Sequence, residues 1–177
     1  MAQEQLILER LEGYDPEIGR WLWAMEDARR RTKHTLKDLS LAAVDWTTPE
    51  DGNTIGTLLY HLAAIEMDWL CADVLEGKCA PEVWELFPHD VRDGEGELTP
   101  VRGLRLDEHL RRLEAVRQIL LDAFRGMTAA EFRRPRHFPD YDVTPEWVLH
   151  HLMQHEAEHR GEMAVLRARV ENALRPP

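Results

Sequence analysis

The sequence predicts an all-α protein, an antiparallel four-helix bundle with a long loop between its second and third helices. Four segments carry apolar residues at helical spacing, at about 16–39, 54–75, 105–125 and 144–172, and no stretch reads convincingly as a strand. A chain of 177 residues that is 44% hydrophobic can fill one core. We therefore expect a single domain over residues 1–177, in which the four helices bury their apolar faces against one another.

Capping residues mark where these helices begin. Asp15-Pro16-Glu17 opens the first helix, with a capping aspartate followed by a proline in the first turn. Asn53 or Thr54 caps the second helix, and Thr144-Pro145-Glu146 opens the fourth. Arg29 interrupts the apolar stripe of the first helix, and the simplest expectation is that its charged head reaches water.

The connections differ in length and composition. Residues 40–53 form a polar connection, and residues 133–143 form a loop punctuated by prolines. Residues 76–103 are a long loop rich in glycine and proline that also contains Trp84, Phe87 and His89. A loop of this length is either a lid or rim over a pocket or a passive surface segment, and the sequence leaves both open.

Net charge and cysteine content exclude some classes of protein. The formal charge is −11 and the isoelectric point is near 5.3, which disfavours binding to nucleic acid or to an anionic membrane surface. No signal peptide and no membrane-spanning run is visible. Cys71 and Cys79 form no C-x-x-C motif, so we expect a reduced, cytoplasmic protein.

The most informative motif is His155-Glu156-Ala157-Glu158-His159 in the fourth helical segment. Residues four apart lie about 40° apart around a helix, so both imidazoles face the same way and can bind one metal ion. H-E-x-x-H is also the motif of zinc proteases, with the glutamate as general base. A protease needs a third ligand after the motif, and the remaining residues offer none that could turn back to the metal. Glu156 is therefore expected at the surface or at a helix interface.

A metal site inside a bundle takes its third ligand from a facing helix. His61 is the best candidate, because it lies in the middle of the second helix on an inward face. Three histidines and one open position describe a catalytic type of site; zinc fits best, and nickel or iron also suit imidazole. Asp68, Glu162 and Thr54 lie on faces from which they could accept the second ring N–H of these ligands. The alternative is that the three histidines are core residues that bind no metal.

Two segments together resemble the DinB-like (YfiT-like) superfamily of metal-binding four-helix bundles. They are Asn53–Ala63, with its single histidine, and the H-x-x-x-H-x-x-x-H-R-G-E run from His151 to Glu162. Their order and spacing match the pattern over almost the whole chain. The resemblance implies that His61, His155 and His159 hold one divalent metal ion per chain. It also implies that His151 packs nearby without binding the metal.

The resemblance further implies a thiol-dependent transferase or isomerase. Characterised relatives use mycothiol, bacillithiol or glutathione, and the other substrate would be a small electrophile. Arg29 and Arg117 lie near apolar stripes and are candidates for holding a carboxylate of the thiol or substrate. A metal-dependent hydrolase at the same site, with Asp68 or Glu162 assisting the water, is the first alternative. A non-catalytic metal-binding or stress-related bundle is the second.

A homodimer is also expected. Trp21, Trp23 and Trp46 give the first helix and its exit more apolar surface than one stripe can bury within a single chain.

Overall fold

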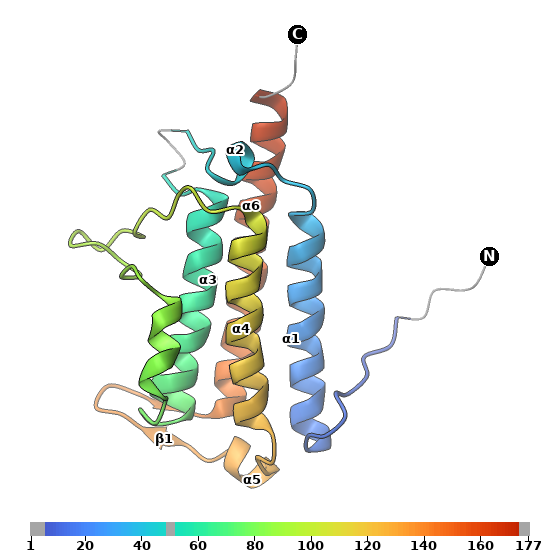
Figure 1. Ribbon diagram of the computed structural model, residues 1–177. Coiled ribbons are helices and arrows are strands. Elements are labelled where there is room, and N and C mark those ends of the chain that lie inside the picture. Colours follow the sequence, from blue (N-terminus) through green and yellow to red (C-terminus); the bar gives the residue numbers. More distant parts are fainter. Residues whose placement is uncertain (1–5, 49–51, 174–177) are drawn as a thin grey trace.

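A computed structural model describes residues 6–48 and 52–173 and confirms the all-α bundle (Figure 1). Its four long helices are α1 (Pro16–Thr35), α3 (Ile55–Trp69), α4 (Leu106–Phe124) and α6 (Pro145–Ala173). The first helix ends at Thr35 rather than at residue 39. The second predicted helix, residues 54–75, consists of α3 followed directly by a π-helix, η1 (Leu70–Val74). The other helix bounds agree closely with the prediction. The single-domain prediction includes residues 1–5 and 174–177, which lie outside the described residues.

The long loop sets the directions of the helices. α1 and α6 run upward in Figure 1, whereas α3 and α4 both run downward, because the chain from residue 75 to 105 returns from the lower to the upper end before α4 begins. α3 therefore runs antiparallel to its neighbour α6 but parallel to its neighbour α4. The bundle is antiparallel as expected except for the pair α3 and α4, and the physical cause of this difference is the crossover.

Short elements occupy the connections. α2 (Leu41–Val44) lies in the predicted polar connection, η2 (Pro81–Leu86) is a 3-10 helix in the long loop, and α5 (Ala129–Phe132) follows α4. The loop after α5 contains a small antiparallel hairpin, β1 (Arg136–His137) and β2 (Asp142–Val143). The expectation that no strand occurs was wrong here, because two-residue strands are too short to show alternation in sequence.

The predicted caps are present. Asp15 Oδ1 accepts a hydrogen bond from Glu17 N at 3.0 Å, and Thr54 Oγ1 accepts one from Thr57 N at 3.0 Å. Each such bond satisfies a backbone donor that the first turn of a helix leaves unpaired. The core between the helices is continuous and contains aliphatic residues from all four long helices, among them Leu22, Leu59, Val116 and Leu152. Within the described residues, no helix combines the length and apolar character that a membrane span requires.

A network of charged side chains crosses this core. Arg29 donates from Nε to Glu156 Oε1 at 2.9 Å and from Nη2 to Glu66 Oε2 at 2.7 Å. Arg117 donates from Nε to Glu66 Oε1 at 2.7 Å and from Nη1 to Glu26 Oε1 at 2.6 Å. The network joins α1, α3, α4 and α6. Arg29 and Arg117 are each only 2% exposed, so the expectation that Arg29 reaches water was wrong.

The network stays charged inside the protein because every charge has an opposite partner. The two arginines lower the pKa of the Glu66 carboxyl against the effect of its burial, and the carboxylates of Glu66, Glu156 and Glu26 raise the pKa of Arg117. A buried charge that loses its partner is strongly destabilising, so all members depend on one another.

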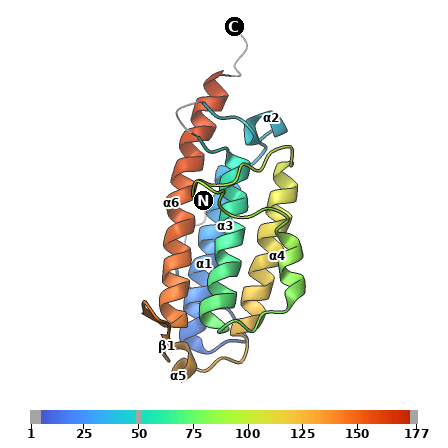
Figure 2. The same ribbon diagram turned by 90° about the vertical axis from the view of Figure 1, so that its left-hand side faces the viewer.

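Side chains of α3 tie the long loop to the bundle. The Tyr60 hydroxyl donates to His89 O at 2.6 Å and accepts from His89 N at 3.0 Å. Thr57 Oγ1 accepts from Val101 N at 3.1 Å. Between these two attachments the loop passes in front of α3 (Figure 2), and Arg92 and Leu98 form an isolated bridge. The loop is therefore held against α3.

A disulfide fastens the start of the same loop. Cys71 of η1 is bonded to Cys79, with their Cα atoms 5.3 Å apart. The expectation that both cysteines are reduced was wrong for this structure. The closed ring is short, since the two residues are eight apart in sequence. The bond therefore joins η1, which continues α3, to the first residues of the crossover.

The imidazole of His109 on α4 is buried without a side-chain hydrogen bond to any residue that the structure describes. Its ring lies against Gly56, where a Cβ atom would be 3.0 Å from His109 Nε2, so a larger residue would require the ring to shift. Neither ring nitrogen has a partner among the described residues. Burial, and secondarily the charge of Arg112, lower the pKa of His109 to about 4. The imidazole is therefore neutral near pH 7.

We predict that Arg117→Met lowers the free energy of unfolding by about 3–5 kcal/mol, because it leaves Glu66 and Glu156 buried with fewer positive partners. Urea unfolding followed by circular dichroism measures this. The matched control is Arg111→Met, which breaks an exposed ion pair with Asp107 at 2.8 Å and should change stability by less than about 1 kcal/mol. Equal effects of the two substitutions would contradict the role assigned to the network.

We also predict that His109 makes stability depend on pH. Its pKa is about 4 in the folded protein and 6.5 in the reference state, so the unfolded chain binds more protons between these values. Above pH 6.5 the ring is mainly neutral in both states, and His109 does not lower stability. As the pH falls from 6.5 towards 4, proton uptake by the unfolded chain lowers the free energy of unfolding by about 3 kcal/mol in total.

His109→Gln should make the pH dependence of the free energy of unfolding shallower in that window, measured by urea unfolding at several pH values. His34→Gln, at an exposed position, is the control and should leave the slope unchanged. An unchanged slope in His109→Gln would refute this prediction.

Candidate metal centre

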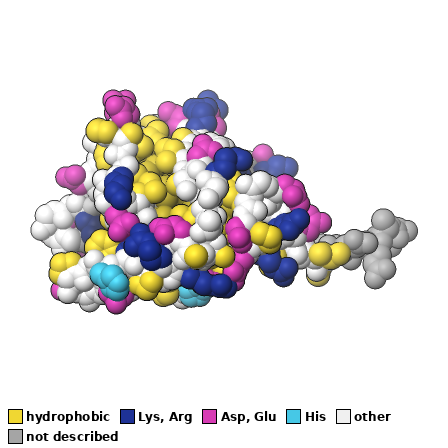
Figure 3. Space-filling view, turned by 90° about the horizontal axis from the view of Figure 1, so that it is seen from below, with side chains coloured by type: hydrophobic (Ala, Val, Ile, Leu, Met, Phe, Trp, Pro, Cys, Tyr) yellow, Lys and Arg dark blue, Asp and Glu magenta, His cyan; other side chains and the backbone are white. Residues whose placement is uncertain are grey.

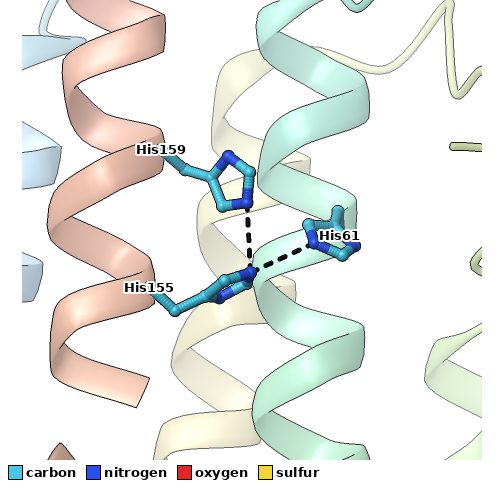
Figure 4. A group of neighbouring side chains, drawn as sticks. All are labelled: His61, His155 and His159. Atoms are coloured by element: carbon cyan, nitrogen blue, oxygen red, sulfur yellow. Dashed lines mark hydrogen bonds between the residues drawn. The ribbon is translucent and has the colours of Figure 1, made fainter. Parts of the chain in front are cut away.

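Three histidines from two antiparallel helices point towards one another (Figure 4). His61 lies on α3, and His155 and His159 lie on consecutive turns of α6. The spacing of four residues places the two α6 imidazoles on one face. His61, on the neighbouring antiparallel helix α3, lies at the same height along the bundle as these two imidazoles (Figure 4). The three residues predicted as metal ligands therefore come together.

The distances between ring nitrogens suit a shared metal ion. His155 Nε2 lies 3.1 Å from His61 Nε2 and 3.0 Å from His159 Nε2, and one nitrogen of each ring lies within 4.8 Å of the others. Two nitrogens that bind one tetrahedral zinc at about 2.0–2.1 Å are roughly 3.3 Å apart. Two of the three separations are thus already close to that of two ligands of one ion, and the third is no more than 4.8 Å. The described residues contain no other group of three or more potential ligands.

The histidines are in the protonation state that a metal requires. Burial, and then the charge of His159 and of Arg92, lower the pKa of His61 to about 4. Burial and the neighbouring histidines lower the pKa of His155 to about 3. Both rings are neutral near pH 7, so each has a nitrogen lone pair available for coordination.

One predicted outer partner is in place. His159 Nδ1 lies 3.1 Å from Glu162 Oε2, so the carboxylate holds the ring proton on Nδ1 and leaves the lone pair on Nε2, which faces the other histidines. Glu162 is one turn beyond His159 on the same helix, which is why spacing alone could indicate this pair.

The other two predicted partners make different contacts or none of this kind. Thr54 accepts from Thr57 N as the helix cap, and within the part of the chain that the structure describes no hydrogen bond joins Asp68 to a histidine ring. His61 Nδ1 is buried without a hydrogen-bond partner among the described residues.

The position of Glu156 argues against the zinc-protease interpretation of the H-E-x-x-H motif. Its carboxylate accepts from Arg29 and, at 3.4 Å, from Arg117, inside the bundle. The residue is 3% exposed. A general base of a protease must face the metal and its water, whereas the Glu156 carboxylate is turned into the bundle and bound by the two arginines. The structure therefore supports the interpretation of Glu156 as a helix-interface carboxylate.

Arg29 and Arg117 also belong to that network. Their guanidinium groups are occupied by Glu66, Glu156 and Glu26, and Arg29 Nη1 donates to Leu113 O at 3.0 Å. A carboxylate of a thiol or substrate would have to displace one of these partners. The geometry thus gives both arginines an internal role rather than the contact with a ligand that the sequence suggested.

Asp68 lies lower on α3, beside a cavity of about 550 Å³ between this helix and the long loop. Trp84, Phe87 and His89 also line this cavity, so the loop forms one wall of a cavity beside α3. Partial burial and the nearby Asp73 carboxylate raise the pKa of Asp68.

Arg92, which the sequence reasoning did not single out, lines the same cavity and is near enough to lower the pKa of His61. No local pattern marks Arg92, since only the fold of the loop brings it here.

The comparisons with known proteins agree with this architecture. A family model described as the DinB superfamily matches residues 24–163, which include all three histidines. A crystal structure of a conserved protein from Enterococcus faecalis superposes with a TM-score of 0.65 at 15% identity, covering 83% of this chain and 92% of that one. At this identity the likeness shows the fold alone. No curated protein matches the chain.

We predict that the purified, untagged protein contains about one divalent metal ion per chain, and that His61→Ala and His159→Ala each lose it, because each removes one of three ligands. Elemental analysis by mass spectrometry measures the content. His151→Ala is the matched control: its ring stacks on His155 but is not one of the convergent three, so the metal should remain. Metal retained by His61→Ala would show that the two helices do not share a site.

Proposed function

The chain belongs to the DinB superfamily, and on that premise we propose that it is a divalent-metal-dependent enzyme that transfers or isomerises its substrate by means of a low-molecular-weight thiol. The observation that carries the proposal is the convergence of His61, His155 and His159, with Nε2 atoms 3.0 and 3.1 Å apart. Three ligands leave a position for a further molecule, as in catalytic rather than structural sites.

The donor set indicates the chemistry. Three neutral imidazoles do not cancel the charge of a divalent ion, and such an ion lowers the pKa of a thiol, so that the nucleophilic thiolate is available near neutral pH. Zinc is the first choice for this donor set, and nickel or iron also fit. Glu162 keeps the proton of His159 on Nδ1, and the buried network keeps α6 turned so that its histidines face α3.

A cavity beside α3, the helix that carries His61, provides room for a small substrate. The cavity under the long loop lies beside α3, with aromatic side chains on one wall and Asp68 and Arg92 at its edge. We propose that an electrophilic small molecule enters here and meets a thiol such as mycothiol, bacillithiol or glutathione.

A metal-dependent hydrolase is the second candidate. The raised pKa of Asp68 favours it, since a carboxylate with a higher pKa accepts a proton from water more readily. Glu162 is less suited to this role because it is hydrogen-bonded to His159. A non-catalytic metal-binding bundle is the remaining alternative. A homodimer stays a prediction; Trp21, Trp23 and Trp46 are half-buried in the single chain.

The proposal predicts metal-dependent consumption of a thiol in the presence of an electrophile such as 1-chloro-2,4-dinitrobenzene, measured over a panel of thiols. Loss of an outer-shell partner typically costs about 10–100-fold, so Glu162→Ala should fall in that range and His155→Ala should lose more. His150→Ala, exposed on the same helix, is the control and should retain full activity.

Three other outcomes would count against this proposal, and two of them would identify an alternative. Equal thiol consumption by the metal-free protein would refute the proposal. Turnover of ester or amide substrates without added thiol would identify the hydrolase. One metal ion per chain without turnover over the whole panel would favour the non-catalytic bundle.

A further inference from the structure

A second cavity, of about 650 Å³, lies at the lower end of the bundle, outside the histidine cluster. Trp69 at the end of α3 and Trp147 in the first turn of α6 form two of its walls, and Tyr141 and neighbouring residues of the hairpin form the third. This end of the molecule shows hydrophobic side chains among acidic and basic ones (Figure 3). The cavity is large enough for a small organic molecule.

Its walls are aromatic and exposed. The rings of Trp69 and Trp147 are 5.3 Å apart, and those of Trp69 and Tyr141 are 6.4 Å apart, centre to centre. Tyr141 and Trp147 are each 47% exposed. Packing of the core therefore does not explain why large aromatic rings stand at these positions.

The electrostatic surroundings of these rings are negative. The Tyr141 hydroxyl donates to the buried Asp73 carboxylate at 2.7 Å, and this bond, with burial and the charges of Asp73, Asp68 and Asp140, raises the pKa of Tyr141 to about 12. Asp142 lines the cavity itself, where it is paired with His137. None of the described residues that line the cavity is basic.

We propose that this aromatic pocket binds an organic cation of the quaternary-ammonium or protonated-amine type. The faces of indole and phenol rings attract such cations because they carry negative electrostatic potential. The donation from Tyr141 to a carboxylate makes its ring richer in electrons, and the nearby aspartates add attraction over a longer range. The same charges oppose an anion, and a neutral ligand gains nothing from them.

The pocket is connected to the histidine cluster along one face of α6. The rings of Trp147 and His151 are stacked 5.0 Å apart at 7°, and those of His151 and His155 are 5.9 Å apart at 26°. Eight residues of helix separate Trp147 from His155, about 12 Å along the axis. A bound cation would therefore lie near the proposed metal site without touching it. Binding of the cation rests on the pocket alone and does not require the proposed function.

Choline and 3,3-dimethylbutan-1-ol make a matched pair of probes, because they have the same shape and differ in the charge of the central atom. We expect choline to shift the indole N–H resonances of Trp69 and Trp147 in ¹⁵N-tryptophan-labelled protein. We expect it to bind about tenfold more tightly than the neutral alcohol. Equal affinity for the two probes would overturn the proposal, since it would show a merely hydrophobic pocket.

Variants locate the binding and separate it from the metal site. Trp147→Leu should abolish the choline-induced shift of Trp69, whereas Trp84→Leu, an exposed tryptophan of the other cavity, should leave it unchanged. Asp73→Asn should weaken choline several-fold and leave the neutral alcohol unaffected. His155→Ala should lose the metal and keep choline, so failure of one proposal is distinguishable from failure of the other. Undiminished choline binding in Trp147→Leu would refute the assignment.

Discussion

Two buried arginines and two buried glutamates hold the four long helices in one register. Arg29 of α1 and Arg117 of α4 each contact Glu66 of α3 and Glu156 of α6. Aliphatic contacts tolerate small slides and rotations of a helix, but a buried ion pair does not, because a displaced charge loses its partner in a medium that solvates it poorly. The geometry of the core therefore depends on this network more than on any single apolar contact.

The network also determines where the histidines point. Glu156 directly follows His155, and successive residues of a helix are about 100° apart. When Glu156 faces the arginines inside the bundle, His155 and His159 are turned towards α3. Glu66 likewise fixes α3, five residues beyond His61. The same side-chain contacts that satisfy the buried charges thus bring three neutral imidazoles from two helices together.

The region around the cluster is built from the connections. The crossover is tied to α3 by Tyr60 and Thr57, and it forms one wall of the cavity beside α3. The hairpin before α6 closes the aromatic pocket at the lower end. Rigid helices therefore position the metal ligands, while loops form the surfaces that a small molecule would contact. This division is common in proteins that bind small ligands.

The sequence by itself determined the features that depend on local spacing. Helical periodicity and capping residues located the four helices, the interval of four residues placed His155 and His159 on one face, and the interval of three paired His159 with Glu162. Only the tertiary structure decided the contacts between distant segments. The burial of Arg29, the place of Arg92, the parallel run of α3 and α4 and the Cys71–Cys79 bond all depend on how helices and loops pack. A residue's own neighbours define its face on a helix, but its partners across the core depend on the rotation and register of every other helix.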